Sequence, residues 1–343
     1  MRQPLENMQV GEPGITLAGR REWVGLAVIA LPCLLTTMDM TVLTLAVPAV
    51  SADLAPSAAQ LLWIVDMYGF VIAGSLVTMG TLGDRIGRRR LLLIGGFAFG
   101  AASVLAAFAQ TAAMLIAARA ILGVAGATLA PSTLSLIRSM FVDDRQRTVA
   151  ISVWTTSFAA GAAIGPFVGG ALLEHFWWGS VFLVAVPVMA LLLLLGPKLL
   201  PEYRDPAAGR LDLLSAAMSL ASVLVVIYGL KRFAERGPGG LAVASVVAGF
   251  VVGALFLRRQ RRLVDPFLDL ALFRVRAFGI ALATFMLSLF VLVGVFLFFA
   301  QYLQLVLGLS PFHAGILTVP SSVGLVVGSM LTQSSCGARL PVS

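Results

Sequence analysis

The sequence predicts an all-helical membrane protein that crosses the bilayer about ten times. Hydrophobic residues make up 59% of the 343-residue chain and charged residues only 12%, about half of the roughly 25% that is typical of a soluble domain. The charges gather in short clusters, and the apolar runs between them reach the roughly 20 residues needed to cross a bilayer. A soluble bundle of buried helices is the alternative, but it does not explain why positive charges alternate along the chain.

Ten apolar runs are expected to form the spanning helices. Residues 91–118 contain no charge, and we divide this long run at 109–111. A second division falls at 308–311, where Gly, Ser and Pro favour a turn. The expected spans are 24–50, 60–82, 91–109, 112–137, 148–173, 177–197, 213–230, 240–257, 277–303 and 312–332.

The distribution of Lys and Arg predicts that the N-terminus lies in the cytoplasm. Of the 24 Lys and Arg residues, 20 fall in alternate segments that begin with the N-terminal tail, and only Lys231, Arg232 and Arg236 fall in the segments between. Cytoplasmic loops carry such an excess, so the net charge of +8 reflects topology, and no nucleic-acid partner is expected. The expected location is a bacterial-type cytoplasmic membrane, with no signal peptide ahead of the first span. Cys33 and Cys336 are not expected to form a disulfide.

The loop after the second span is a candidate gate. Its glycines permit a tight turn, and Asp84 can lie at a helix N-terminus and pair with an arginine. A charge cluster that forms in one conformation and breaks in another would control access to a central site, although the same arginines could act only as a topology anchor. The candidate residues are Gly80, Gly83, Asp84, Arg85, Gly87, Arg88 and Arg89.

The fifth span carries small residues at a spacing of four. Gly161, Gly165 and Gly169 share one helix face, so a neighbouring helix can approach closely. Pro166 removes a backbone donor and can kink the helix, and Gly170 completes the pattern. Small-residue spacing is also common in membrane helices that only pack.

Three ionisable residues, Asp39, Asp66 and Arg119, are expected inside spans. Such residues are rare, usually paired, and functional by default. At about 1.5 Å per residue, Asp39 falls toward the outer end of its helix and all three fall in the outer half of the bilayer, within reach of one aqueous cavity. Asp66 could instead lie at the wet outer mouth, and Asp39 with Arg119 could form a static pair that fixes helix register.

The motifs together resemble those of the major facilitator superfamily. The loop at 80–90 resembles its signature loop, and 119–131 resembles its Arg-bearing fourth-helix motif, although Leu122 replaces a residue that is usually polar. The glycines at 161–170 resemble the motif that marks antiporters. In this superfamily the first and fourth helices line the central cavity, so the resemblance implies that Asp39 and Arg119 face each other.

Further stretches resemble the fourteen-helix drug:proton antiporters, and among them the pumps for antiseptics, quaternary ammonium compounds and viologens. The stretches are 35–48, 63–68, 177–183 and 301–315; Ala185 departs from the family, which usually has Asn there. Tyr68, Trp63, Trp177 and Trp178 stand at span ends and are expected to anchor at the membrane interface.

The resemblance implies a division of the chain into five parts and the absence of four of fourteen helices. The parts are a cytoplasmic tail (1–22), a six-helix bundle (23–197), two linking helices with their loops (198–276), the first two helices of a second bundle (277–332) and an atypical tail (333–343).

The function expected from these features is proton-coupled export of lipophilic cationic drugs or antiseptics. Asp39, Asp66 and Arg119 would couple protons to the cation, with no cofactor besides the proton-motive force. The expected partners are small lipophilic cations, protons and lipids, and a full-length form is not expected to oligomerise. No catalytic or metal-ligating residues stand out, so an enzyme is not expected. Two alternatives remain open: a non-transporting fragment of such a pump, and a proton-coupled exporter of another metabolite or antibiotic.

Overall fold

The computed structural model describes residues 17–204, 212–237, 239–263 and 272–309, together with four isolated residues at 270, 317, 320 and 324. Within these residues the regular structure is helical, and eight helical segments are long and apolar enough to cross a membrane. A ninth apolar helix follows them. The tenth expected span, 312–332, lies outside the described residues apart from three isolated positions.

Most of the helices extend past at least one end of the apolar run that predicted them, because polar residues continue the helix there. Side chains of Ser57, Thr111, Asp143 and Asp212 accept hydrogen bonds from the first-turn backbone and so fix four helix starts. The helices are α1 (Arg20–Leu54), α2 (Ala58–Ile86), α3 (Arg88–Ala107), α4 (Ala112–Met140), α5 (Asp144–His175), α6 (Ser180–Leu183), α7 (Ala185–Leu199), α8 (Leu213–Arg236), α9 (Gly240–Gln260) and α10 (Arg276–Gln301).

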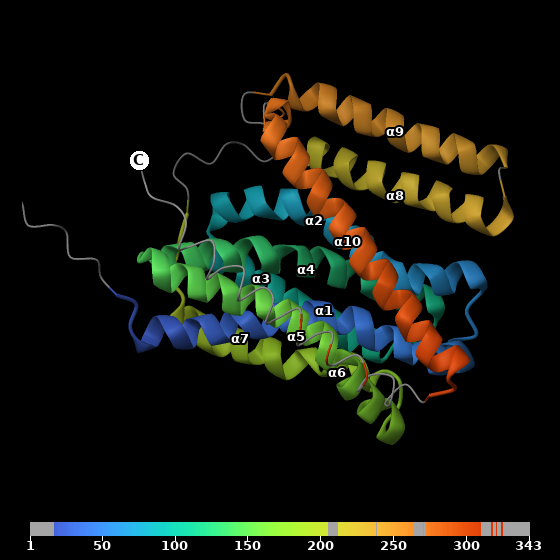
Figure 1. The fold of residues 1–343 in the computed structure, drawn as a ribbon, viewed down its shortest axis with the longest axis horizontal. Coiled ribbons are helices and arrows are strands. Elements are labelled where there is room, and N and C mark those ends of the chain that lie inside the picture. The colour runs from blue at the N-terminus through green and yellow to red at the C-terminus, as the bar shows by residue number, and fades with distance from the viewer. Residues whose placement is uncertain are drawn as a thin grey trace, which may run out of the picture.

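Helices α1 to α7 form one bundle around a shared hydrophobic core (Figure 1). The sixth expected span is interrupted, because a short helix, α6, precedes α7. Within the bundle α1 packs mainly on α5, α2 packs on α4, and α3 packs on α4 and α7. Glycines permit these close approaches: a Cβ atom at Gly95 would lie 1.8 Å from Thr128 Oγ1, and one at Gly123 would lie 2.7 Å from Val71 Cβ.

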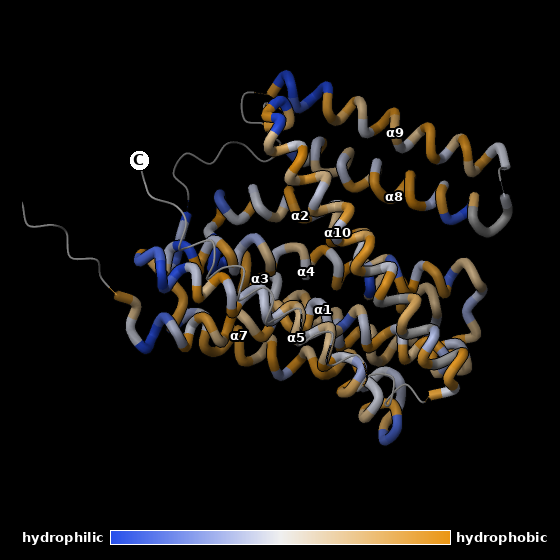
Figure 2. Tube along the Cα trace, in the orientation of Figure 1, coloured by the Kyte–Doolittle hydropathy of each residue, from blue (hydrophilic) through white to orange (hydrophobic). Residues whose placement is uncertain are grey.

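Helices α8 and α9 form a hairpin outside this bundle, against α2 (Figure 1). Gly229 and Gly249 bring the two helices together, and Leu220 of α8 packs against Gly74 of α2. Only 11% of the residues in the most apolar part of α8 and of α9 are buried. Most of their apolar surface is therefore available to lipid (Figure 2).

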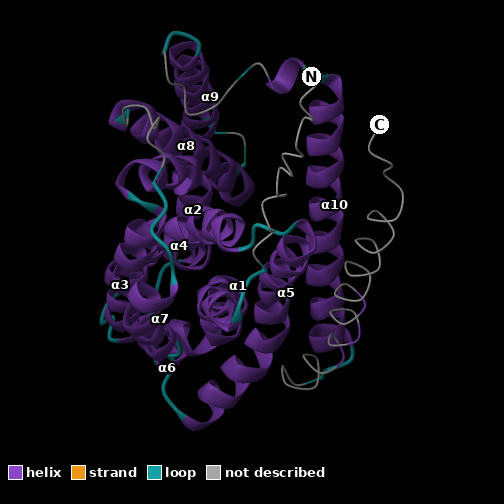
Figure 3. Cartoon of the chain, turned by 90° about the vertical axis from the view of Figure 1, so that its left-hand side faces the viewer, coloured by secondary structure: helices purple, strands orange, loops and turns teal. Residues whose placement is uncertain are grey.

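Helix α10 lies apart from the core and beyond α5 (Figure 3). Large apolar side chains such as Phe285, Met286, Phe290 and Phe298 are exposed on it. It leads into a π-helical turn at Tyr302–Val306.

Candidate functional site

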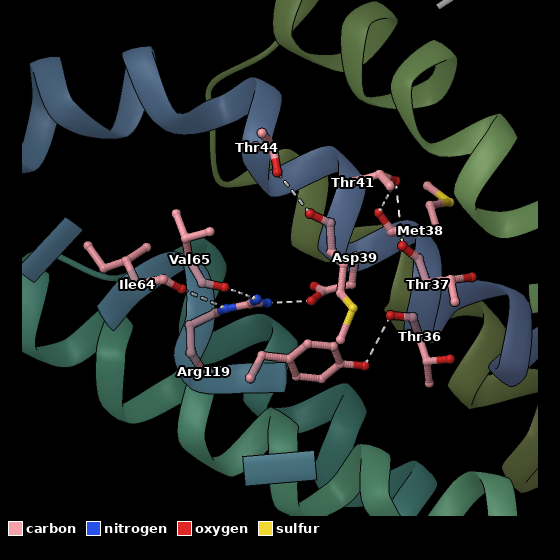
Figure 4. A network of polar contacts seen from close by, with 11 residues as sticks. Thr36, Thr37, Met38, Asp39, Thr41, Thr44, Ile64, Val65 and Arg119 are labelled. Carbon is pink, nitrogen blue, oxygen red and sulfur yellow. Dashed lines mark hydrogen bonds and ion pairs between the residues drawn. The ribbon is translucent and has the colours of Figure 1, made fainter. Parts of the chain in front are cut away.

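A buried ion pair joins α4 to α1 near the centre of the bundle. Arg119 Nη1 of α4 donates to Asp39 Oδ2 of α1 (Figure 4). The Arg119 side chain is 0% exposed and that of Asp39 is 12% exposed. The two residues therefore face each other, as the family resemblance implies. Each charge has the other as its partner inside the bundle.

The Arg119 guanidinium is held by α2 as well as by Asp39. Nε donates to the carbonyl oxygen of Ile64 at 3.1 Å, and Nη2 donates to that of Val65 at 3.3 Å. The ring of Tyr68 lies against it, with Cζ 4.6 Å from the ring centroid, which is a favourable cation–π distance. These contacts leave Arg119 fixed on α2 even without its carboxylate partner.

Tyr68 is not the interface anchor that its position at a span end suggested. Its side chain is fully buried, and its hydroxyl donates to the carbonyl oxygen of Thr36 at 3.3 Å. Trp178 is also buried, and its Nε1 donates to Asp53 Oδ2 at 2.7 Å. Helix extension explains the outcome for Tyr68, because α2 begins ten residues before it and the ring turns inward toward α4.

The expected position of Asp39 along its helix was also wrong. Asp39 lies near the middle of the 35-residue helix α1, which continues to Leu54, and not toward its outer end. Pro48 does not end α1, so it was a poor marker of the end of the helix. Asp39 nevertheless meets Arg119, which lies in the first third of α4.

The face of α1 next to Asp39 packs on the glycines of α5. A Cβ atom at Gly161 would lie 2.0 Å from the carbonyl oxygen of Leu34, and one at Gly165 would lie 2.0 Å from Thr41 Oγ1. Gly169 meets Val42 in the same way, at 2.8 Å. Three of the expected glycines therefore allow α5 to approach the turns of α1 that carry Asp39.

Gly170 of this motif does not make such a contact. A Cβ atom at Gly170 would have nothing within 4 Å. Helix α5 continues through Pro166 without interruption. Within this motif, Gly161, Gly165 and Gly169 form the close contacts with α1.

Asp66 is directed away from the Arg119 pair and toward α8. Its Oδ2 lies 2.5 Å from Lys231 Nζ, which also donates to the carbonyl oxygen of Leu62 at 2.9 Å. The same ammonium lies 5.2 Å from the ring centroid of Trp63, and Trp63 stacks on Tyr228 of α8. The sequence did not reveal this partner, because Lys231 falls in an expected outer loop.

The candidate gate is a tight turn between α2 and α3. Arg88 Nη2 donates to Asp84 Oδ1 across Gly87, whose φ of 108° is disfavoured for any residue with a Cβ atom. Asp84 lies in the last turn of α2 and not at a helix N-terminus as expected, because α2 continues to Ile86. A Cβ atom at Gly83 would approach Arg88 to 2.9 Å, whereas one at Gly80 would make only ordinary contact with Pro131.

This turn is anchored by Glu202, which the sequence did not single out. Arg89 Nε lies 3.4 Å from Glu202 Oε2, and the backbone N–H of Arg88 donates to the carbonyl oxygen of Tyr203 at 2.8 Å. Nε and Nη1 of the buried Arg88 side chain have no partner within the part of the chain that the structure describes. The only sequence signal for Glu202 was an acidic residue in a basic segment. No ion partner of Arg85 is seen among the described residues.

Comparison with known proteins identifies the family. Residues 29–340 match the family model of the Major Facilitator Superfamily. The chain belongs to this superfamily, whose members are membrane transporters and not enzymes. A crystal structure of a peptide transporter, POT, in complex with sulfate has the same fold: its TM-score is 0.51 at 20% identity, over 69% of this chain and 52% of that one.

Several drug-resistance transporters are homologous to the chain. It is 51% identical to the multidrug efflux pump LfrA of Mycolicibacterium smegmatis, over 93% of this chain and 64% of LfrA. It is 40% identical to the methyl viologen resistance protein SmvA of Salmonella typhimurium, over 93% of this chain and 66% of SmvA. The puromycin resistance protein pur8 of Streptomyces alboniger is 36% identical over 91% of this chain and 62% of pur8. The chain thus spans about two thirds of the length of these relatives.

The packing of α5 on α1 predicts that Gly161→Ala destabilises the bundle. The new methyl group would meet the rigid backbone of Leu34, so the helices must separate, at a cost of about 1–3 kcal/mol. Gly170→Ala is the matched control and should have no such effect. The measurement is the thermal unfolding midpoint of the detergent-solubilised protein. Equal shifts in the two variants would contradict the assigned interface.

The contact between Asp66 and Lys231 predicts that Lys231→Met loosens α8 from α2. Docking is measured as oxidative cross-linking of Gly74→Cys with Leu220→Cys, in a background without Cys33 and Cys336. A Cβ atom at position 74 would lie 3.6 Å from that of Leu220, a distance that suits a disulfide. Lys231→Met should slow cross-linking by up to about fivefold, the factor allowed by an ion pair of about 1 kcal/mol.

Asp66→Asn should slow the same cross-linking to a similar extent, and the double variant should add little more. The pair Gly74→Cys with Leu230→Cys is the negative control, because Leu230 is exposed. An unchanged rate in Lys231→Met would show that the ion pair does not hold α8 in place.

Proposed function

We propose that this chain forms the drug- and proton-binding part of an antiporter that exports lipophilic cations across the cytoplasmic membrane. The observation that carries the proposal is the buried pair of Asp39 and Arg119. Support for the substrate class comes from the names of the relatives LfrA and SmvA, which denote a multidrug efflux pump and methyl viologen resistance.

The ion pair can open because Arg119 keeps other contacts when Asp39 is neutralised. Arg119 has three further contacts on α2, and we propose that Asp39 is the group that binds and releases the transported proton. A proton or an organic cation that neutralises Asp39 removes its attraction to Arg119 and releases α1 from α4. Breaking such a buried pair costs about 3–5 kcal/mol, enough to make the two states of the bundle distinct.

We propose that the turn at Gly87 acts as the gate of this cycle. The ion pairs of Asp84 with Arg88 and of Arg89 with Glu202 join α2, α3 and the segment after α7. The free donors of Arg88 could bind an acceptor in another conformation. Asp66 is a less direct participant, because its described partner is Lys231.

Export of another metabolite or antibiotic remains the second candidate. The specific observation in its favour is that the relative pur8 is named for resistance to puromycin, an antibiotic, and not for resistance to a viologen. A substrate panel that contains viologens, quaternary ammonium compounds and puromycin separates the two candidates.

We further propose that the N-terminus and the turn at Gly87 face the cytoplasm, in accord with the distribution of Lys and Arg. In the cysteine-free background, Arg90→Cys should react with an impermeant thiol reagent only after the cells are opened. Arg232→Cys should react in intact cells. Labelling of Arg90→Cys from outside would refute this orientation.

Replacement of Asp39 by Asn should abolish proton-driven transport. Asn keeps the shape and a hydrogen-bond acceptor for Arg119 but cannot exchange a proton, so dye uptake into energised inverted vesicles should fall at least about tenfold. Because the chain spans 64% of LfrA, the assay uses residues 1–332 joined to the C-terminal helices of LfrA, with residues 1–343 alone measured in parallel.

Asp144→Asn is the matched control for this experiment. It removes a carboxylate from an exposed surface pair with Arg147, and transport should be unchanged. Asp39→Glu tests whether charge alone restores some activity. Full uptake of a monovalent dye by Asp39→Asn, with normal expression, would show that Asp39 is structural and would refute the coupling role.

A further inference from the structure

A cleft of about 490 Å³ lies between the start of α8 and the end of α9. One side of its lining is basic and consists of Arg258, Arg259 and Arg262. The other side is apolar and consists of Leu214, Met218, Leu255 and Leu263. This cleft is remote from Asp39 and has no part in the proposed transport cycle.

The three arginines are not equivalent, because an internal carboxylate engages one of them. Asp212 Oδ2 accepts a hydrogen bond from Arg259 Nε at 2.7 Å and another from Ser215 Oγ at 2.7 Å. This interaction lowers the pKa of Asp212 to about 2, so the contribution of the pair to stability is complete above about pH 3.8 and is lost only as the pH falls through about 2. At physiological pH Asp212 is therefore charged and paired with Arg259.

Arg258 and Arg262 remain available to a ligand. Both are exposed, and neither has an ion partner within the residues that the structure describes. Both line the cleft, Arg258 from the last turn of α9 and Arg262 from the turn that follows it. The cleft thus carries two positive charges without an internal counter-charge among these residues.

The position of the cleft relative to the apolar surface identifies the kind of ligand. The arginines follow directly after the apolar part of α9, where Figure 2 shows the change from hydrophobic to hydrophilic residues. Leu214 and Leu255 are 54% and 48% exposed, and Leu255 lies about one helical turn before the arginines, toward the apolar part of α9. In a bilayer we expect the arginines to lie at the level of the lipid headgroups and the apolar part of α9 at the level of the acyl chains.

We propose that this cleft binds an anionic phospholipid, with its phosphate against Arg258 and Arg262 and an acyl chain along Leu214, Met218 and Leu255. Basic pockets between spanning helices at a membrane surface suit such headgroups. Free phosphate could satisfy the arginines but would leave the apolar half of the cleft unfilled. A lipid bound in the cleft would contact both α8 and α9, because side chains of both helices line it.

The test measures binding of fluorescent phosphatidylglycerol to the detergent-solubilised chain by fluorescence anisotropy. Arg258→Gln with Arg262→Gln should weaken binding about 25-fold, since each arginine near an anionic surface contributes about fivefold. The matched control is Arg138→Gln with Arg145→Gln, which removes two arginines from the same end of the bundle but from outside the cleft. This control should change the affinity less than about twofold.

Two further measurements separate a lipid site from a site for free anions. Fluorescent phosphatidylcholine should bind at least about tenfold more weakly than phosphatidylglycerol, and millimolar inorganic phosphate should not displace the lipid. Leu255→Trp fills the apolar half without changing charge and should also weaken phosphatidylglycerol binding. It keeps the test valid if the double arginine variant fails to fold.

Three outcomes would overturn the proposal. Equal losses in the cleft and control variants would mean that the anionic lipid is attracted by overall charge. Complete displacement by inorganic phosphate would identify a free-anion site. Unchanged affinity in both Leu255→Trp and the double arginine variant would mean that the lipid does not occupy the cleft.

Discussion

The buried guanidinium of Arg119 is the constraint on which the arrangement of the central helices depends. Moving an unpaired charge into a low-dielectric interior costs several kcal/mol, so neighbouring helices must supply acceptors. Helix α2 supplies two carbonyl oxygens and an aromatic ring, and α1 supplies the carboxylate of Asp39. The positions of α1, α2 and α4 are therefore specified by one polar side chain as well as by the apolar core.

Small residues make this polar cluster sterically possible. Gly123 lets α4 approach α2 until Val71 and the Tyr68 backbone are in contact, one helical turn from Arg119. Gly161 and Gly165 bring α5 equally close to α1 on a face beside Asp39. Lipid gives little hydrophobic force between helices, so close backbone approach and the buried ion pair together have to hold them in register.

The helical fold and the first nine expected spans could be predicted from the sequence, because apolar length and charge alternation are local signals that a bilayer makes nearly obligatory. The pairing of Asp39 with Arg119 could be predicted only through the resemblance, since no spacing within the chain says that the first and fourth helices are neighbours. Lys231 and Glu202 were missed for the same reason: each meets its partner across more than 100 residues. Tyr68 was misinterpreted because an aromatic residue near a span end is ambiguous until the helix length is known.

The contacts also divide the central bundle into two groups with different freedom. Helix α1 packs most extensively on α5, whereas α4 packs on α2 and α3. Neutralising Asp39 would leave Arg119 on the second group, bound to the α2 carbonyls, while the glycine contacts keep α1 with α5. Helix α7 contacts both α1 and α3 and so bridges the two groups. The ion pair of Arg89 with Glu202 lies where α7 ends. In the proposed cycle, neutralising Asp39 lets α1 and α5 move relative to α2, α3 and α4. The turn at Gly87, which joins α2 to α3, would take part in the same movement.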